Sequence, residues 1–297
     1  MFHTTAGRLA LPAWSILLCY CNMSAEPFRS FRVGTFNARE LSALASASRQ
    51  YKAARIVELM DADVVLLEEV AGRAALDALA SQAPIRGHYS YRLARVGNDE
   101  RGFGLALLSK WPPSWVRSHR EDRFRLRGDE AGTAYRYARD CLEVHFKLGP
   151  HRLALLGVHF RSQVADDPEH RLAEAQHTRD IVDQLLERDP ELKLLVLGDL
   201  NSTPGSAAWQ TLVGISSQSG RGPMLTDATQ GLPPSERWTW EAFGKKPDGQ
   251  LLDGMLANPN LASFLVPGSV AILHDDDLPS GLGEVSDHAP LAATFAQ

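Results

Sequence analysis

A short apolar run that stops at an acid constrains the possible folds of this chain most strongly. Leu194–Leu197 is typical of a buried strand, and Gly198 and Pro204 bracket the polar residues that follow it. Asp199 and Asn201 stand two positions apart, so an extended chain would direct both side chains to one face. Carboxylate and carboxamide oxygens suit a magnesium-bound phosphate or an activated water better than a soft metal. An Asx-rich turn after a strand is the structural alternative.

A second polar pair lies far downstream, close to the end of the chain. Asp287 and His288 precede the apolar run Leu291–Phe295, which is typical of a short final strand. A strand-end acid and amide, followed much later by an Asp-His pair, resembles the endonuclease/exonuclease/phosphatase superfamily. That superfamily includes pancreatic-type deoxyribonucleases, neutral sphingomyelinases, inositol-polyphosphate 5-phosphatases and abasic-site endonucleases.

Further segments occur in the order that this resemblance predicts. Each one is a short apolar run with the polar or glycine residues found at that place in the superfamily. They are Phe31–Asn37, Asp63–Val70, Gly102–Ser109, Arg139–Val144, Leu155–His159 and Gln250–Leu256. A single segment is weakly specific, whereas the ordered set extends from Phe31 to Phe295 and is strongly specific.

The resemblance assigns roles to residues in these segments. Asp63–Val70 matches the strand of the magnesium-binding glutamate, which aligns with Glu69, and Glu68 stands where the superfamily usually has glutamine. The implied catalytic residues are His159, Asp199, Asn201, Asp253 and His288; the implied substrate-binding residues are Asn37, Arg139 and Asn201; and the implied metal ligands are Glu69, Asn37 and Asp287.

Phosphodiester hydrolysis needs an attacking water, a base, charge neutralisation on the phosphoryl oxygens and help for the leaving oxygen. We expect Mg²⁺, or Mn²⁺ in its place, to be held by a few protein oxygens and by water. Asp199 would orient or deprotonate the attacking water, while the amide of Asn201 holds the phosphate. His288, with its tautomer fixed by Asp253, would act on a phosphoryl oxygen, and His159 would act near the leaving oxygen. Which histidine is the acid and which is the base stays open.

Helical segments alternate with the strand segments. Apolar residues at helical spacing predict helices over Tyr51–Met60 and Glu169–Arg188. Such a pattern allows helices packed outside sheets. The resemblance, not the periodicity, implies an α+β fold that is a four-layer α/β/β/α sandwich of two packed mixed β-sheets flanked by helices. No repeat or linker divides the chain, so we expect a single catalytic domain over residues 30–297.

The N-terminal residues differ from the rest of the chain. Arg8 precedes the apolar stretch Leu9–Cys21, which is too short to span a bilayer as a helix, and small residues follow at Ser24 and Ala25. This pattern predicts a signal peptide over residues 1–25, and hence a secreted or periplasmic protein with no transmembrane segment in the mature chain. A mis-assigned start codon or a disordered leader is the alternative. The remaining cysteine, Cys141, is expected to be a small buried side chain rather than a nucleophile.

The substrate is less constrained than the reaction class. The histidine at His159, and Ala38–Arg39 where abasic-site enzymes carry an acid, argue against the abasic-site branch. Trp238–Trp240, followed by Lys245 and Lys246, is similar to a hairpin of secreted bacterial-type nucleases. Its aromatic rings could stack on bases, and packing within a hairpin is the alternative. The net charge of −5 does not indicate tight nonspecific binding to nucleic acid.

We expect a monomer that takes nucleic acid as its substrate and has no stable protein partner. A sphingomyelinase-like or inositol-phosphatase-like hydrolase, and a catalytically silent binding module of the same fold, stay open. Outside the motifs, His119, His151 and His274 are expected to be solvated, and Glu68 to be an exposed or supporting acid. The arginines of 117–127 predict either a surface for a polyanion or a charged loop.

Overall fold

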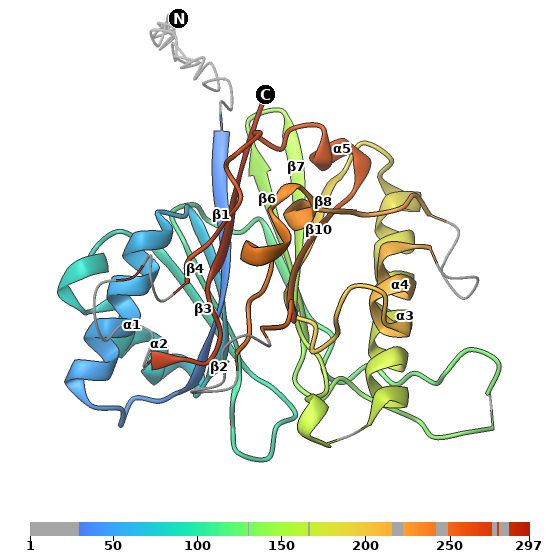
Figure 1. Ribbon diagram of the computed structural model, residues 1–297, viewed down its shortest axis with the longest axis horizontal. Helices are drawn as coiled ribbons and strands as arrows, with labels where there is room; N and C mark the ends of the chain where they lie inside the picture. The colour runs from blue at the N-terminus through green and yellow to red at the C-terminus, as the bar shows by residue number, and fades with distance from the viewer. Residues whose placement is uncertain are drawn as a thin grey trace, which may run out of the picture.

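The computed structural model describes residues 30–129, 131–165, 167–215, 222–241, 249–274, 278 and 285–297. The predicted signal peptide over residues 1–25 and the basic pair Lys245 and Lys246 lie outside these ranges. Two six-stranded mixed sheets pack face to face, and helices cover both outer faces (Figure 1). The predicted four-layer sandwich is therefore confirmed.

The first sheet has the strand order β11-β12-β1-β2-β4-β3. β1 and β2 run parallel to each other, and the other neighbours are antiparallel. Its strands are β1 (Ser30–Leu41), β2 (Val64–Val70), β3 (Tyr91–Val96), β4 (Gly104–Ser109), β11 (Ala271–Ile272) and β12 (Leu291–Ala296).

The second sheet has the strand order β5-β6-β7-β8-β10-β9, with β7 and β8 parallel and the remaining pairs antiparallel. Its strands are β5 (Trp115–Ser118), β6 (Cys141–Leu148), β7 (His151–His159), β8 (Lys193–Asp199), β9 (Thr226–Asp227) and β10 (Asp253–Ala257). Cys141 on β6 is a buried free thiol, as predicted.

The longer helices lie on the two outer sides of the sandwich, and the short α5 lies near its upper end (Figure 1). They are α1 (Ala47–Met60), α2 (Gly72–Ala80), α3 (Pro168–Arg188), α4 (Ala207–Val213) and α5 (Pro259–Ala262), with short 3₁₀ turns η1 (Ala83–Ile85), η2 (Gln163–Ala165), η3 (Ala228–Gly231) and η4 (Pro234–Glu236). α1 and α2 cover the first sheet, whereas α3 and α4 cover the second. No helix of the described ranges is long and apolar enough to cross a membrane.

Local sequence explains where the two long helices begin. The Ser46 hydroxyl accepts a hydrogen bond from the backbone N–H of Arg49 at 3.2 Å, so α1 starts ahead of the predicted Tyr51. α3 begins at Pro168 behind the side chain of Asp167, which caps the N–H of His170 at 3.1 Å. The predicted helix over 169–188 therefore agrees with α3 almost to the residue.

Alternation along β2 determines what each of its side chains contacts. Val64 and Leu66 belong to the core between the sheets, and Val65 and Leu67 pack beneath α1 and α2. Continuing this alternation places Glu68 between the sheets at the end of the strand. A buried acid at that place needs polar partners, because an isolated charge in a core is strongly unfavourable.

The parallel pairs bring polar strand ends together. β1 and β2 end at the same side of the first sheet, and β7 and β8 end at the same side of the second. Asp199 lies opposite His159 in the parallel register and opposite Asp253 in the antiparallel one. The C-terminal ends of these strands form the shared edge where the candidate site lies.

Candidate active site

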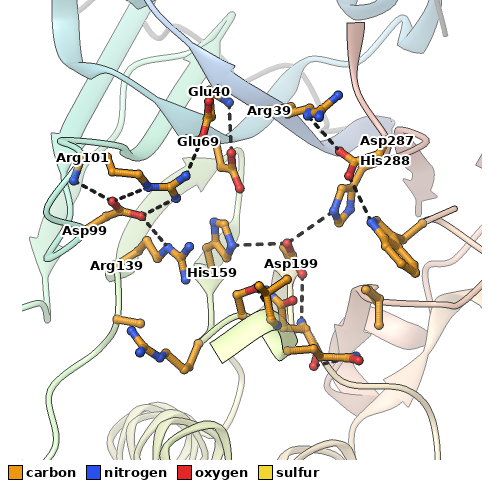
Figure 2. Close-up of a pocket in the computed structure, with 18 of the residues that line it drawn as sticks. Arg39, Glu40, Glu69, Asp99, Arg101, Arg139, His159, Asp199, Asp287 and His288 are labelled. Carbon is orange, nitrogen blue, oxygen red and sulfur yellow. Dashed lines mark hydrogen bonds and ion pairs between the residues drawn. The ribbon is translucent and has the colours of Figure 1, made fainter. Parts of the chain in front are cut away.

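Asp199 is the centre of the site. Its Oδ2 lies 3.3 Å from His159 Nε2 on one side and 3.8 Å from His288 Nε2 on the other (Figure 2). The same oxygen accepts a hydrogen bond from Asn37 Nδ2 at 3.1 Å. Oδ1 accepts one from the backbone N–H of Asn201 at 2.9 Å. A carboxylate from the second sheet is thereby tied to an asparagine of the first.

His288 is held by a second acid. Its Nδ1 lies 2.8 Å from Oδ2 of Asp253, which leaves Nε2 directed toward Asp199. Burial lowers the pKa of His288, but the negative charges of Asp253 and Asp199 outweigh this and raise it to about 10. His288 is therefore a protonated donor at neutral pH.

The pKa values of Asp199 and His159 are both shifted in the direction that favours the neutral form, whereas that of His288 is shifted toward the charged form. Burial raises the pKa of Asp199 to about 7, although the charge of His288 and the hydrogen bonds from Asn201 and Asn37 favour its ionised form. Burial, together with the charge of Arg139, lowers the pKa of His159 well below its ordinary value. The site thus places a neutral histidine, an acid that titrates near neutrality and a charged histidine side by side.

Glu69 reaches the same space from the first sheet. Its backbone adopts a left-handed conformation with φ of 57°, where β2 departs from its regular pairing. Its Oε2 accepts a hydrogen bond from the N–H of Glu40 at 3.0 Å, and its Oε1 lies 3.5 Å from Asn37 Nδ2. The Oδ1 of Asn37 accepts a hydrogen bond from the N–H of Arg39 at 2.9 Å. The donor group Nδ2 of Asn37 therefore faces the carboxylates of Glu69 and Asp199.

Asp287 and Trp240 line the opposite rim. Trp240 Nε1 donates to Asp287 Oδ2 at 3.3 Å, and Arg39 Nε lies 3.7 Å from Asp287 Oδ1. The Thr239 hydroxyl accepts the backbone N–H groups of Leu252 and Asp253, at 3.1 and 2.9 Å. The Trp-Thr-Trp segment therefore positions both members of the downstream acid set, Asp253 and Asp287.

Arginines gather on the His159 side of the site. Arg139 is buried, donates to the carbonyl of Phe160 at 3.2 Å and has its Nε 3.4 Å from Asp99 Oδ2. Arg101 pairs with Asp99 at 2.8 Å and with Glu40. Asp99 is thus shared between two guanidinium groups (Figure 2).

These side chains surround one cavity of about 770 Å³. The structure brings most of the predicted site residues to its wall: Glu69, Arg139, His159, Asp199, Asn201, Asp287 and His288. Asn37 and Asp253 stand behind the wall and contact it through Asp199 and His288. The individual roles of all nine stay predictions.

Asn201 reaches the cavity by a different route from the one expected. The strand ends at Asp199, and Asn201 has a left-handed backbone with φ of 45°, so strand alternation does not describe this pair. The Asn201 side chain donates to the carbonyl of Phe160 at 3.2 Å. The Asx-type turn offered as the structural alternative is present at the site itself, because Asp199 Oδ1 accepts the backbone N–H of Asn201 at 2.9 Å.

For Glu68 the structure excludes the exposed alternative and leaves the supporting one, whereas the expectation that His119 is solvated is wrong. Glu68 is not exposed: it is fully buried between the sheets, and its Oε1 accepts the Thr35 hydroxyl hydrogen at 2.5 Å. His119 is not solvated: it is buried, with Nδ1 2.8 Å from Asp122 and Nε2 2.9 Å from Glu143. In both cases a partner comes from a distant segment that the local sequence does not reveal, Thr35 for Glu68 and Glu143 for His119.

The other residues outside the motifs are less buried. His151 and His274 are partly exposed, and the ring of His274 stacks on Trp238 with centroids 4.0 Å apart. In the arginine-rich segment, Arg117, Arg120 and Arg127 pair with Asp122, Glu121 and Asp180, respectively. These ion pairs favour the charged-loop interpretation of that segment.

Sequence reasoning missed several residues of the cavity wall. Asp99 and Arg101 come from the β3–β4 connection, Arg161 follows β7, and Glu40 lies at the end of β1. The sequence offered one signal for two of them, which is closeness along the chain to a predicted motif: Arg161 stands two positions after His159, and Arg101 directly precedes the glycine-rich segment.

A four-layer sandwich whose two sheets share one edge lined by acids, histidines and arginines defines the class of deoxyribonuclease-like folds. The family model described as "Endonuclease/Exonuclease/phosphatase family" matches residues 34–288. The chain therefore belongs to the endonuclease/exonuclease/phosphatase family, as the resemblance predicted. Members of this family are generally hydrolases of phosphoester bonds and typically use divalent metals. No curated protein matches the chain.

Solved structures share the fold at low identity. Truncated Caenorhabditis elegans TDP2 has a TM-score of 0.63 and 20% identity, covering 90% of this chain and 98% of that chain. A functionally unknown conserved protein of Enterococcus faecalis V583 has a TM-score of 0.62 and 19% identity, covering 90% of this chain and 100% of that chain. D. rerio TDP2 complexed with a single-strand DNA product has a TM-score of 0.60 and 18% identity, covering 90% of this chain and 99% of that chain.

Proposed function

We propose that this chain is a Mg²⁺-dependent phosphodiesterase that hydrolyses DNA or RNA by attack of water. One observation carries the proposal: Asp199 lies between His159 and His288, with Asp253 behind His288, on the wall of a cavity that also holds Glu69. This arrangement supplies an acceptor for a proton, a charged donor and a hard-oxygen ligand around one space.

The donor set fits a hard divalent cation. Glu69 and Asp287 are carboxylates on the wall of the same cavity, and carboxylate oxygens are preferred by Mg²⁺ and by Mn²⁺. Asp199, Asp253 and His288 also bring ligand atoms within 4.8 Å of one another. In that trio, however, His288 Nδ1 and Asp253 Oδ2 already contact each other at 2.8 Å, so we propose Glu69 as the metal ligand. When bound, the metal would neutralise charge on the phosphoryl oxygens and orient the phosphate.

The protein side chains divide the remaining tasks. Asp199, whose pKa of about 7 suits proton transfer near neutrality, would orient the attacking water and accept its proton. His288, kept charged by Asp253, would donate to a phosphoryl oxygen. His159, whose lowered pKa keeps it neutral, would contact the substrate near the leaving oxygen. The side-chain amide of Asn201 would donate a hydrogen bond to the phosphate.

The preference for nucleic acid rests on two supports. D. rerio TDP2, which shares the fold, is described in complex with a single-strand DNA product. The cavity of this chain carries arginines on one side and Trp240 on the other, which suits a substrate with both anionic and aromatic parts.

Hydrolysis by the purified full-length chain tests the proposal. Plasmid DNA, RNA, sphingomyelin and inositol polyphosphates are incubated with Mg²⁺, with Mn²⁺ or with EDTA. Asp199→Asn serves as the site variant, and Asp189→Asn, at the end of α3, as the matched control. We expect metal-dependent cleavage of DNA or RNA that is lost only in Asp199→Asn. Cleavage of the lipid or the inositol phosphates alone would overturn the substrate, and no cleavage by a folded protein would favour the binding module.

A further inference from the structure

Arg161 is the arginine of the cavity wall whose charge is least compensated. It follows the end of β7 by two residues and lines the cavity beside Arg139, Ser162 and Gln163. Its Nε is buried without a hydrogen-bond partner, and its guanidinium forms no ion pair with any residue that the structure describes. An unpartnered buried polar group is costly, so such a group is expected to meet a ligand.

The Nε of Arg139 also lacks a hydrogen-bond partner, but Arg139 and Arg101, unlike Arg161, each have an acidic partner. Arg101 and Arg139 share Asp99, and Arg101 also pairs with Glu40. The nearest buried acid, Glu174, is occupied by backbone groups: it accepts the N–H of Ala138 at 2.6 Å and that of Arg161 at 2.7 Å. Burial raises the pKa of Glu174 to about 8 against the opposing charges of Arg139 and Arg161, and its side chain forms no ion pair with the Arg161 guanidinium in the described part of the chain.

Arg161 follows His159 by two positions and lines the cavity together with Arg139. The scissile phosphate is expected between Asp199, His288 and Glu69, where the acceptor, the charged donor and the metal ligand converge. Arg101, Asp99 and Arg139 lie on the His159 side of Asp199, and His288 lies on its other side (Figure 2). An anion bound on the His159 side would be a second group on the same substrate.

We propose that Arg161, next to Arg139, binds a second phosphate of the substrate, adjacent to the phosphoester that is cleaved. This inference rests on the proposed function and names the chemistry of its substrate. A planar guanidinium presents paired donors that match phosphate oxygens. The second phosphate is either the neighbouring linkage of a nucleic acid or a further phosphate of a small polyol.

Equilibrium binding tests this site independently of turnover. Isothermal titration of the full-length chain compares thymidine 3′,5′-bisphosphate with thymidine 5′-monophosphate, and inositol 1,4-bisphosphate with inositol 1-phosphate. The variants are Arg161→Gln and, as matched control, Arg152→Gln at the opposite end of β7, where the arginine pairs with Asp189 on the surface. Thermal unfolding of each variant verifies that it is folded.

We expect the wild type and Arg152→Gln to bind the bisphosphate at least about tenfold more tightly than the monophosphate, the value of one charged hydrogen bond. Arg161→Gln should abolish that preference and leave monophosphate binding unchanged, and Arg161→Lys should restore part of it. A preference in the thymidine pair identifies a nucleic-acid linkage, and one in the inositol pair identifies a polyol phosphate. No preference in the wild type, or one that Arg161→Gln retains, would overturn the inference.

Kinetics separate this inference from the proposed function. Bis(p-nitrophenyl) phosphate carries only the scissile phosphate, whereas a single-stranded oligonucleotide carries neighbours. Arg161→Gln should lower kcat/KM about tenfold on the oligonucleotide and leave bis(p-nitrophenyl) phosphate unchanged. An equal loss on both substrates would contradict a second-phosphate site, while the absence of any wild-type hydrolysis would contradict the proposed function alone.

Discussion

Asp253 controls the protonation of His288 through a single contact. Replacing it in Asp253→Asn removes the largest of the negative charges that raise the pKa of His288 to about 10. In the wild type a step that needs protonated His288 is therefore independent of pH up to about that value. In the variant the proton is lost at lower pH, so activity should fall as pH rises through neutrality. We expect kcat to drop on the order of 10²- to 10⁴-fold.

A pH profile of kcat/KM on the substrate identified by the panel measures this effect. Asp189→Asn, which removes a surface carboxylate paired with Arg152, should reproduce the wild-type profile. A parallel downward shift of the Asp253→Asn profile, with no change in shape, would mean that Asp253 supports the fold rather than the charge of His288.

His119 forms a second buried network that does not belong to the site. Burial lowers its pKa, but the hydrogen bonds to Glu143 and Asp122 raise it above its ordinary value. Hydrogen bonds to His119 and His145 hold the pKa of Glu143 at about 2 despite its burial. The histidine therefore stabilises the fold fully below its unfolded pKa of about 6.5, and less as pH rises through its folded value.

His119→Leu should lower the free energy of unfolding by about 2 to 4 kcal/mol at pH 6 and by clearly less at pH 9. Urea denaturation at both pH values provides the measurement. His151→Leu is the control, because His151 lies at the surface with Gln297 as its hydrogen-bond partner. Equal losses for His119→Leu at pH 6 and pH 9 would show that packing, not charge, explains the effect.

At the scale of elements, β8 can reach the site only because Gly198 precedes Asp199. Gly198 has φ of 127°, and a Cβ there would lie 2.0 Å from the carbonyl oxygen of Val158 on β7. Gly198→Ala should therefore destabilise the protein by more than about 3 kcal/mol and displace Asp199. Urea denaturation compares it with Gly87→Ala, where φ is also positive but no atom lies within 4 Å. Similar losses in the two variants would contradict the close approach of β7.

The sequence predicted elements well where one segment carries the whole signal. Apolar runs located β8 and β12, and helical spacing located α3 nearly to the residue. The sequence did not predict contacts between segments that lie far apart along the chain. Glu68 needs Thr35 of β1, and His119 needs Glu143 of β6, so neither burial could be inferred from its own neighbours.

The same limit applied to the candidate site. Motif order indicated the residues that end strands, such as His159 and Asp199. A residue at the C-terminal end of such a strand lies at the shared edge of the sheets, so its position in the sequence predicts its position in the site. Arg161 and Asp99 lie in connections, whose paths depend on the packed sheets. Strand alternation also could not anticipate the left-handed turn that directs Asn201 to the cavity.

At the scale of the whole molecule, the site joins the two sheets. The hydrogen bond from Asn37 of β1 to Asp199 of β8 crosses between them at 3.1 Å, and Glu69 of β2 faces the same cavity. A cation held there would bind the folded protein and not the unfolded chain, so it would raise the stability of the entire sandwich. At a concentration about a hundred times its Kd the gain is about 2.7 kcal/mol.

Thermal unfolding with and without Mg²⁺ should therefore show a higher Tm with the metal in the wild type and no such increase in Glu69→Gln. Glu100→Gln, which alters another acid of the cavity wall, should keep the increase. A Glu69→Gln variant that still gains stability, together with an Asp253→Asn variant that does not, would place the cation at Asp199, Asp253 and His288 instead. In that case the cation would replace the proton that the contact with Asp253 stabilises on His288. A residue other than His288 would then have to act as the charged donor.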